Sequence, residues 1–236
     1  MALPTVVFDF DGTLALGRGP VLAYARHVGE ATGDETFLAE LRALLDDVDA
    51  GKTRLLDGYD AVRRLAVARA VPDDVLQAAY QASRGDLGTA AAPVTAPEGL
   101  EPFLAELSRD ARLVLATNAP ETGAQRALEQ LGAADHLQLR HFAIGKPAGL
   151  AAVVATYLPD GPVLSIGDIW DYDLAPAEEL GAATALVGPH AERTDVSPTM
   201  RAATLAGLYG DIQTWAALGG PGTSAPAGVD SHHGKA

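Results

Sequence analysis

Residues 5–14 read TVVFDFDGTL, and this stretch decides the fold that the sequence predicts. It begins with a β-branched and aromatic run, which is typical of a strand buried on both faces of a parallel sheet. The Asp-Gly pair that follows favours a turn. Because alternate residues of an extended chain point to the same side, we expect Asp9 and Asp11 to share one space at the end of this strand.

The composition limits the kinds of protein that this chain can be. Its 236 residues include 31 acidic and 17 basic side chains, a formal net charge of −14, and no cysteine. Such an acidic chain is a poor ligand for nucleic acid. The lack of cysteine excludes disulfides and thiolate metal sites and favours a cytoplasmic location. The apolar stretch 147–159 is too short to span a membrane, and no basic leader begins the chain, so we expect a soluble protein.

The hydrophobic pattern changes twice along the chain. Residues 20–84 have helical periodicity with room for about four helices, and the Ala- and Pro-rich segment 88–99 predicts a linker. After it, helices and strands alternate. The predicted helices are 101–108, 121–131, 150–157 and 174–180, and the predicted strands after the first are 113–117, 137–142, 163–166 and 183–187.

This alternation predicts an α/β fold with a doubly wound, Rossmann-like and mostly parallel sheet. Because a long helical stretch separates the first strand from the others, we expect an all-helical cap inserted into the core. The expected boundaries are 1–16 and 90–218 for the core and 17–89 for the cap. Residues 219–236 are rich in Gly, Pro, Ser and Ala and predict a disordered tail.

Polar residues follow four of the segments that make up the predicted core. In an open parallel sheet, ligands bind beyond the carboxyl ends of the strands, so these residues are expected to meet. Neighbouring carboxylates repel one another unless a cation lies between them, and an all-oxygen ligand set favours Mg²⁺. The segments are Asp9 to Thr13, Thr117-Asn118, Gly145-Lys146-Pro147 and Gly167-Asp168 with Asp171 and Asp173.

Each of these segments also has an ordinary structural explanation, such as a turn or a helix cap, and only their joint occurrence favours a site. Lys146 adds to that argument, because the chain has three lysines and 14 arginines. A compact ammonium suits a point contact with a phosphoryl oxygen or a carboxylate.

Four segments together resemble the sequence motifs of the haloacid dehalogenase superfamily. The resemblance covers 1–16 and 95–188, whereas 17–89 resembles only the helical insertion of members with a C1-type cap. The motifs are TVVFDFDGTL at 5–14, LVLATN at 113–118, GKP at 145–147 and LSIGDIWDYD at 164–173.

The resemblance implies a role for each matching residue. Asp9 corresponds to the nucleophile that attacks phosphorus, and Asp11 to the general acid and base. Thr117 would hydrogen-bond a phosphoryl oxygen, and Lys146 would balance charge on the nucleophile and the phosphoryl group. The physical chemistry agrees, because a carboxylate nucleophile divides a difficult displacement into two steps.

The resemblance also implies a Mg²⁺ site. Asp9, the backbone carbonyl of Asp11 and Asp168 would hold the ion, and Asp173 corresponds to the second acidic residue of the fourth motif and is expected at the same site. Asp171 is an additional acid between them, and the sequence leaves open whether it reaches the metal or faces solvent.

Substrate recognition is expected from residues near the second motif and in the cap. The candidates are Thr117, Asn118, Arg18 and Arg54, with Lys52 as a further cation, although the cap cations also fit solvated helix ends.

The resemblance predicts a phosphatase, because superfamily members that cleave carbon–halogen bonds lack an acid at the position of Asp11. We therefore expect Mg²⁺-dependent hydrolysis of a small phosphorylated metabolite through an aspartyl phosphate. A phosphomutase and a non-catalytic ligand-binding member are the alternatives. The sequence leaves the substrate and the oligomeric state open.

Overall fold

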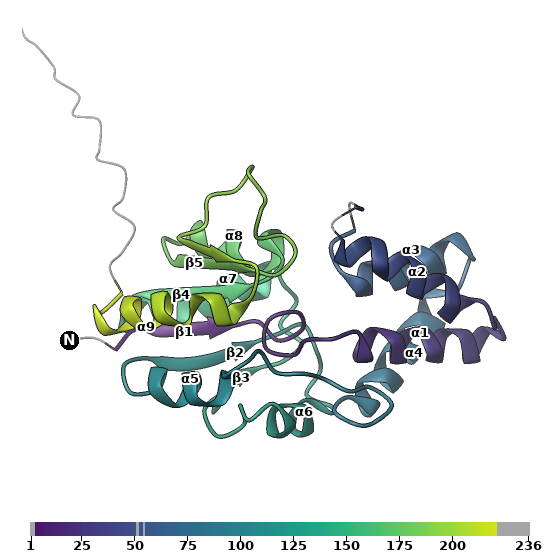
Figure 1. Cartoon of the computed structure of the whole chain (residues 1–236), viewed down its shortest axis with the longest axis horizontal. Coiled ribbons are helices and arrows are strands. Elements are labelled where there is room, and N and C mark those ends of the chain that lie inside the picture. The colour runs from purple at the N-terminus through teal and green to yellow at the C-terminus, as the bar shows by residue number, and fades with distance from the viewer. Residues whose placement is uncertain (1–2, 51, 54, 221–236) are drawn as a thin grey trace, which may run out of the picture.

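The first motif forms strand β1 and the turn after it, and β1 lies in the middle of the sheet (Figure 1). The computed structural model describes residues 3–50, 52–53 and 55–220. Six parallel strands form one sheet in the order β3-β2-β1-β4-β5-β6. They are β1 (Thr5–Phe8), β2 (Arg112–Ala116), β3 (Leu139–His141), β4 (Val163–Gly167), β5 (Ala183–Val187) and β6 (Met200–Ala202).

Helices cover both faces of this sheet. The helices of the core are α5 (Leu100–Leu107), α6 (Ala124–Gln130), α7 (Ala148–Tyr157), α8 (Ala175–Glu178) and α9 (Tyr209–Ala217), with short helical turns η1 (Leu158–Asp160), η2 (Trp170–Leu174) and η3 (Leu205–Leu208). Val6 and Phe8 pack into the hydrophobic cluster that includes α5, α6 and α9, and Val7 packs into the cluster on the α7 side. This alternation follows from the two-residue period of a strand and confirms the doubly wound architecture.

Four further helices form the inserted cap at one end of the molecule (Figure 1). The cap has a hydrophobic cluster of its own, in which Phe37, Leu41 and Ala61 are fully buried. The chain crosses between core and cap twice, and Leu16 and Thr95 pair at these crossings through two backbone hydrogen bonds of 2.8 and 3.0 Å. The helices are α1 (Gly19–Thr32), α2 (Phe37–Asp49), α3 (Gly58–Ala68) and α4 (Asp73–Asp86).

Some local predictions need correction. The sequence did not predict the edge strand β6, whose three residues are all partly or fully exposed and show no apolar run. The predicted strand 137–142 is formed only at Leu139–His141. The predicted helix 174–180 begins earlier, as the π-helical turn η2, and its α-helical part has four residues.

The domain boundaries stay a prediction. Of the tail predicted to be disordered, only Gly219 and Gly220 belong to the described residues, and 221–236 lie outside them. None of the helices in the described part of the chain is long and apolar enough to cross a membrane.

Leu104 tests whether the core depends on this packing. It is fully buried against the sheet, so Leu104→Ala should lower the free energy of unfolding by about 2–5 kcal/mol. Leu218→Ala is the matched control, since Leu218 is 69 % exposed, and should change it by less than about 0.5 kcal/mol. Urea unfolding followed by tryptophan fluorescence measures both. Equal losses would contradict the assigned core.

Candidate active site

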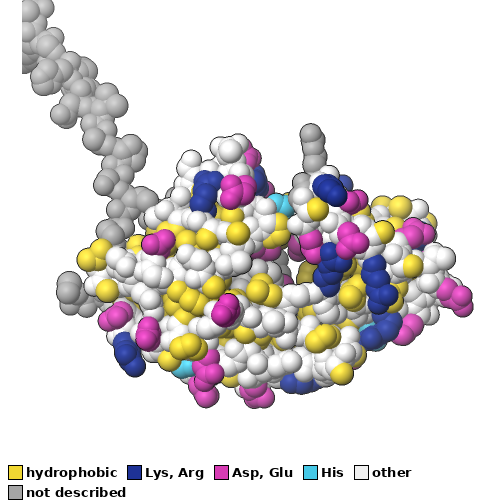
Figure 2. All heavy atoms as spheres, viewed as in Figure 1, with side chains coloured by type: hydrophobic (Ala, Val, Ile, Leu, Met, Phe, Trp, Pro, Cys, Tyr) yellow, Lys and Arg dark blue, Asp and Glu magenta, His cyan; other side chains and the backbone are white. Residues whose placement is uncertain are grey.

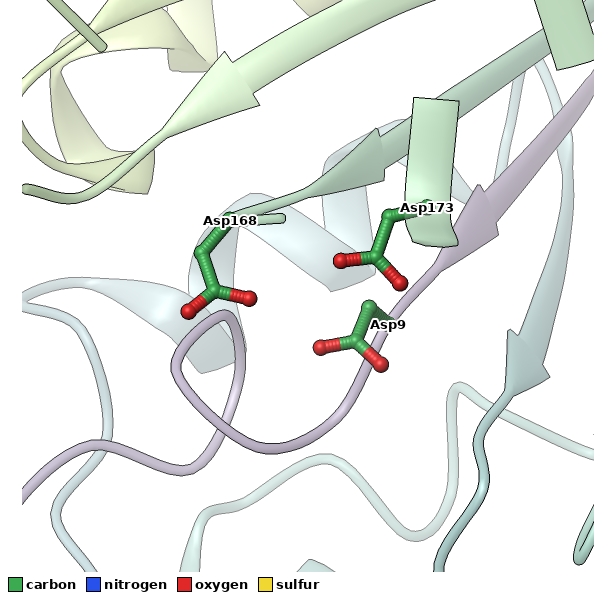
Figure 3. Close-up of side chains that lie close together, drawn as sticks. All are labelled: Asp9, Asp168 and Asp173. Carbon is green, nitrogen blue, oxygen red and sulfur yellow. The ribbon is translucent and has the colours of Figure 1, made fainter. Parts of the chain in front are cut away.

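Three carboxylates meet at the carboxyl end of the sheet. Asp9 follows β1, Asp168 follows β4, and Asp173 lies in η2 (Figure 3). Oxygens from all three lie within 4.8 Å of one another, and all three residues are buried. The parallel register therefore brings together acids that are about 160 positions apart in the sequence.

Two glycines make this close approach possible. Gly12 has a φ of +83°, and a Cβ atom built there would lie 2.2 Å from Asp168 Oδ2. A Cβ atom at Gly167 would lie 2.2 Å from Asp173 Cβ. Any larger residue at either position would push an acid out of the cluster, so the glycines belong to the site as much as the acids do.

Lys146 provides the positive charge inside the cluster. Its Nζ donates hydrogen bonds to Asp9 Oδ1 at 2.5 Å and to Asp173 Oδ1 at 2.7 Å, and its side chain is 3 % exposed. The Lys146 backbone N–H donates to Asn118 Oδ1 at 2.7 Å, so Asn118 fixes the loop that carries the lysine. Thr13 Oγ1 donates to the other Asp9 oxygen at 3.2 Å.

The cluster holds more negative charge than Lys146 can balance. Burial, reinforced by Asp173, raises the pKa of Asp9 from 3.8 to about 7, although Lys146 acts in the opposite direction. Burial, together with the negative charges of Asp173 and Asp9, raises the pKa of Asp168 well above its usual range. Burial alone would lower the pKa of Lys146, but Asp9 and Asp173 outweigh it and raise that pKa. The arrangement therefore favours an additional cation.

The donor set fits a hard divalent cation. All the candidate ligands are carboxylate oxygens, which suit Mg²⁺. Among the described residues, no hydrogen-bond donor contacts the Asp168 carboxylate, so both of its oxygens are available. Asp173 is more engaged, because Oδ1 accepts from Lys146 and Oδ2 accepts from the Ile169 backbone N–H at 3.0 Å.

Asp11 lies beside this cluster and contacts the cap. Its Oδ1 accepts hydrogen bonds from Tyr59 Oη at 3.0 Å and from Arg84 Nη1 at 3.1 Å. Tyr59 belongs to α3 and Arg84 to α4. Burial first, and then the negative charge of Asp11, raise the pKa of the Tyr59 hydroxyl well above its usual range. Tyr59 is therefore a hydrogen-bond donor at neutral pH.

A cavity of about 620 Å³ lies between core and cap, above the carboxylates. Figure 2 shows the hollow, with acidic side chains inside it and Lys or Arg side chains on its cap rim. Thr117 lines it and is buried, and its Oγ1 accepts a hydrogen bond from the Ala119 backbone N–H at 3.0 Å. The other residues of interest that line the cavity are Asp9, Asp11, Asn118, Lys146, Asp168 and Asp173 from the core and Tyr24, Asp57, Tyr59, Asp60, Arg63, Arg64 and Tyr80 from the cap.

The structure does not bring Arg18 or Lys52 to Asp9. Arg18 pairs with Asp46 at 2.7 Å and with Asp49 at 2.6 Å. It lines a neighbouring cavity of about 300 Å³, whose lining includes Asp11 and Asp168 but not Asp9. Lys52 is exposed and lines neither cavity, and Arg54 lies outside the described residues.

Asp171 also stays apart from the carboxylate cluster. Its side chain is 64 % exposed and lies 3.8 Å from Arg193 Nη1. It therefore faces solvent, which answers the question that the sequence left open.

Sequence analysis assigned no role to three residues that contact the central acids. Thr13 belongs to the first motif, so its short distance from Asp9 along the chain could have indicated this contact. Tyr59 and Arg84 are 48 and 73 positions from Asp11, so no such short distance could have indicated their contacts. No short-range pattern shows which side chain of a helical insertion faces the core.

Comparison with protein families gives one match over most of the chain. The model of the haloacid dehalogenase-like hydrolases matches residues 3–181. No curated protein matches the sequence closely enough to count as a relative.

Solved structures with low sequence identity share the fold. One is the putative HAD-hydrolase YfnB from Bacillus subtilis bound to magnesium, with a TM-score of 0.62, 15 % identity, and coverage of 90 % of this chain and 99 % of that one. A putative phosphoglycolate phosphatase from Lactobacillus plantarum gives 0.60 and 18 %, with 88 % and 98 % covered. A 2-haloacid dehalogenase from Pseudomonas syringae gives 0.56 and 20 %, with 91 % and 100 % covered.

These identities are too low to transfer an activity, and the similar structures include both a phosphatase and a dehalogenase. The match to the family model extends from before β1 to beyond α8 and so includes all the acids of the cluster. The chain therefore belongs to the haloacid dehalogenase-like hydrolase family.

Proposed function

We propose that this hydrolase cleaves small phosphate monoesters with the help of Mg²⁺, through an aspartyl phosphate on Asp9. The observation that carries the proposal is the setting of the Asp9 carboxylate. It lies at the floor of the cavity between core and cap, in contact with Lys146 and Thr13, and Asp11 lines the same cavity. A nucleophile, a charge-balancing cation and a proton donor thus face one space.

In the proposed first step, an Asp9 carboxylate oxygen forms a bond to phosphorus while the bond between phosphorus and the leaving oxygen breaks. Asp11 donates its proton to that oxygen, and the alcohol leaves. Lys146 lies against Asp9 and stabilises charge on the phosphoryl oxygens, and Thr117 is placed to hydrogen-bond one of them.

In the second step, water attacks phosphorus and gives a proton to Asp11, and the bond between phosphorus and Asp9 breaks. Inorganic phosphate leaves, and both carboxyl groups return to their starting states. Bound Mg²⁺ would neutralise negative charge shared by the carboxylates and the phosphoryl group. We assign its protein ligands to Asp9, Asp168 and the backbone carbonyl of Asp11, with Asp173 next to them as the partner of Lys146.

The position of Asp11 favours ester hydrolysis over carbon–halogen cleavage. An alkoxide is a poor leaving group unless it is protonated, whereas a halide needs no proton. Asp11 lines the cavity and lies two positions from the proposed nucleophile, so it can supply that proton. Release of inorganic phosphate without transfer to a second hydroxyl group would separate this activity from that of a phosphomutase.

The cap wall of the cavity is where we place the leaving group. Tyr24, Tyr59 and Tyr80 form a packed group with ring centroids 5.6–6.3 Å apart. Arg63 lines the same wall, and the described part of the chain offers it no ion-pair partner. A volume of about 620 Å³ suits a small metabolite.

The nucleophile is tested by Asp9→Asn. This change keeps the shape of the side chain but removes the attacking oxygen, so Mg²⁺-dependent release of phosphate from a small ester panel should fall more than about 1,000-fold. The control is Asp171→Asn, which removes a nearby exposed acid outside the cluster and should keep activity within about 3-fold. Substantial turnover by Asp9→Asn would contradict the aspartyl phosphate.

The cation site is tested by thermal unfolding at two pH values. Because the pKa of Asp9 rises from 3.8 to about 7 on folding, the folded chain keeps a proton that the unfolded chain releases. Without Mg²⁺, this group therefore removes stability as the pH rises from about 4 to 7. Mg²⁺ needs the ionised carboxylates, so it should raise the unfolding midpoint more at pH 8 than at pH 5.

Asp168→Asn is the control for this experiment. It removes one of the repelling acids and a proposed ligand, so it should raise the midpoint of the Mg²⁺-free protein at pH 8 and abolish most of the Mg²⁺ effect. A change of about 1 kcal/mol corresponds to about 2–4 °C in a chain of this size. An equal Mg²⁺ effect in both proteins would place the cation elsewhere.

A further inference from the structure

Asp11 takes part in a three-membered contact that links core and cap. Its Oδ1 accepts from Tyr59 Oη at 3.0 Å and from Arg84 Nη1 at 3.1 Å. Arg84 Nη1 also donates to Tyr59 Oη at 2.7 Å. One oxygen of the carboxylate is therefore held by two donors that also contact each other.

Burial of the Arg84 guanidinium group costs free energy of folding, and a contribution of this residue to stability alone does not explain it. The residue is fully buried, and its Nε and Nη2 atoms have no hydrogen-bond partner in the described structure. Its guanidinium group lies 6.0 Å from the ring centroid of Phe10 and 5.9 Å from that of Tyr80. Among the described residues, Asp11 is its only ion-pair partner. A buried arginine with an incomplete set of hydrogen bonds is weak support for stability, which points to a role at Asp11.

Tyr59 is held so that its hydroxyl group stays on Asp11. Its ring packs against Tyr24 and Tyr80 with centroid distances of 6.3 and 6.1 Å. The rotation of the side chain is therefore limited by its neighbours, and the hydroxyl direction is set by packing inside the cap.

We infer that Tyr59 and Arg84 position Asp11 for proton transfer to the leaving group, an inference that rests on the proposed phosphatase activity. Both donors engage Oδ1, so the proton that moves is carried by Oδ2. It passes from Oδ2 to the leaving oxygen as the phosphorus–oxygen bond breaks, and a proton from water returns to Oδ2 in the second step. Tyr59 and Arg84 keep their own protons throughout and act as positioning residues.

Residues of the cap help to position the Asp11 carboxyl group. Asp11 belongs to the core, whereas both positioning residues belong to cap helices. In the described part of the chain, the two crossings that join core and cap pair with each other at Leu16 and Thr95. The orientation of Asp11 is therefore fixed only while the cap lies over the cavity, so proton transfer is coupled to the presence of the cap above the bound ester.

The experiment compares two esters that differ in their need for an acid. The leaving group of 4-nitrophenyl phosphate departs without a proton, whereas the more basic leaving group of phenyl phosphate depends on one. Tyr59→Phe removes only the hydroxyl group. It should lower kcat/KM for phenyl phosphate about 10- to 100-fold, and for 4-nitrophenyl phosphate less than about 3-fold. Asp11→Asn removes the proposed acid itself, so it sets the upper limit of the difference between the losses of kcat/KM for the two esters.

Tyr80→Phe is the matched control. Tyr80 belongs to the same packed group and lines the same cavity, but its hydroxyl group does not contact Asp11. Tyr80→Phe should change kcat/KM for both esters by similar factors. Arg84→Lys keeps the charge but removes the planar guanidinium group that holds Nη1 between Asp11 and Tyr59, and it should show a leaving-group effect in the same direction as Tyr59→Phe. Should Arg84→Lys not fold, Tyr59→Phe alone decides the question.

Three results would overturn the inference. They are equal losses for both esters in Tyr59→Phe, no loss for either ester, and a gain in activity, which would mean that the contact restrains Asp11. A wild-type protein that hydrolyses neither ester with Mg²⁺ would instead remove the proposed function and this inference with it, so the two failures are distinguishable.

Discussion

The mutual repulsion of buried carboxylates around one ammonium is the interaction on which the site depends. Lys146 contacts Asp9 and Asp173 directly, and Asp168 lies within reach of both acids without a donor of its own in the described structure. Such a cluster is costly unless its charge is balanced, and burial increases that cost. The fold therefore maintains a place where an additional cation is favoured.

The sheet gives this cluster its rigidity. Parallel strands β1 and β4 end side by side, and the turns that follow place their acids at the same edge. The close approach of Gly12 to Asp168 and of Gly167 to Asp173 leaves no space for side chains at the glycines. Asp9, the proposed nucleophile, is thus fixed in a closely packed part of the molecule, as a reaction with strict geometric demands requires.

The cap contributes a different kind of group. Its tyrosines and Arg63 form the wall opposite the carboxylates, and Tyr59 and Arg84 reach the acid that lies nearest to the cap. The core therefore carries the groups proposed to act on phosphorus, whereas the cap carries the groups proposed to face the leaving part of the ester. The paired crossings at Leu16 and Thr95 provide a narrow connection between these two parts.

The sequence by itself determined the fold class and which polar residues meet at the strand ends. A buried strand has a local hydrophobic signature, and the parallel-sheet rule then predicts that residues such as Asp9, Lys146 and Asp168 meet. The edge strand β6 and the turn η2 lacked such a signature, because one is largely exposed and the other is irregular.

Only the tertiary structure decided which cap residues face the core. Sequence analysis made Arg18 a candidate and assigned no role to Arg84, yet Arg18 pairs with Asp46 and Asp49 of the cap helix α2, and Arg84 reaches Asp11 across 73 positions. The physical reason is that the facing side of a helix depends on how the helices pack against one another. That packing is set by many weak contacts distant in the chain, and no short pattern of residues encodes it.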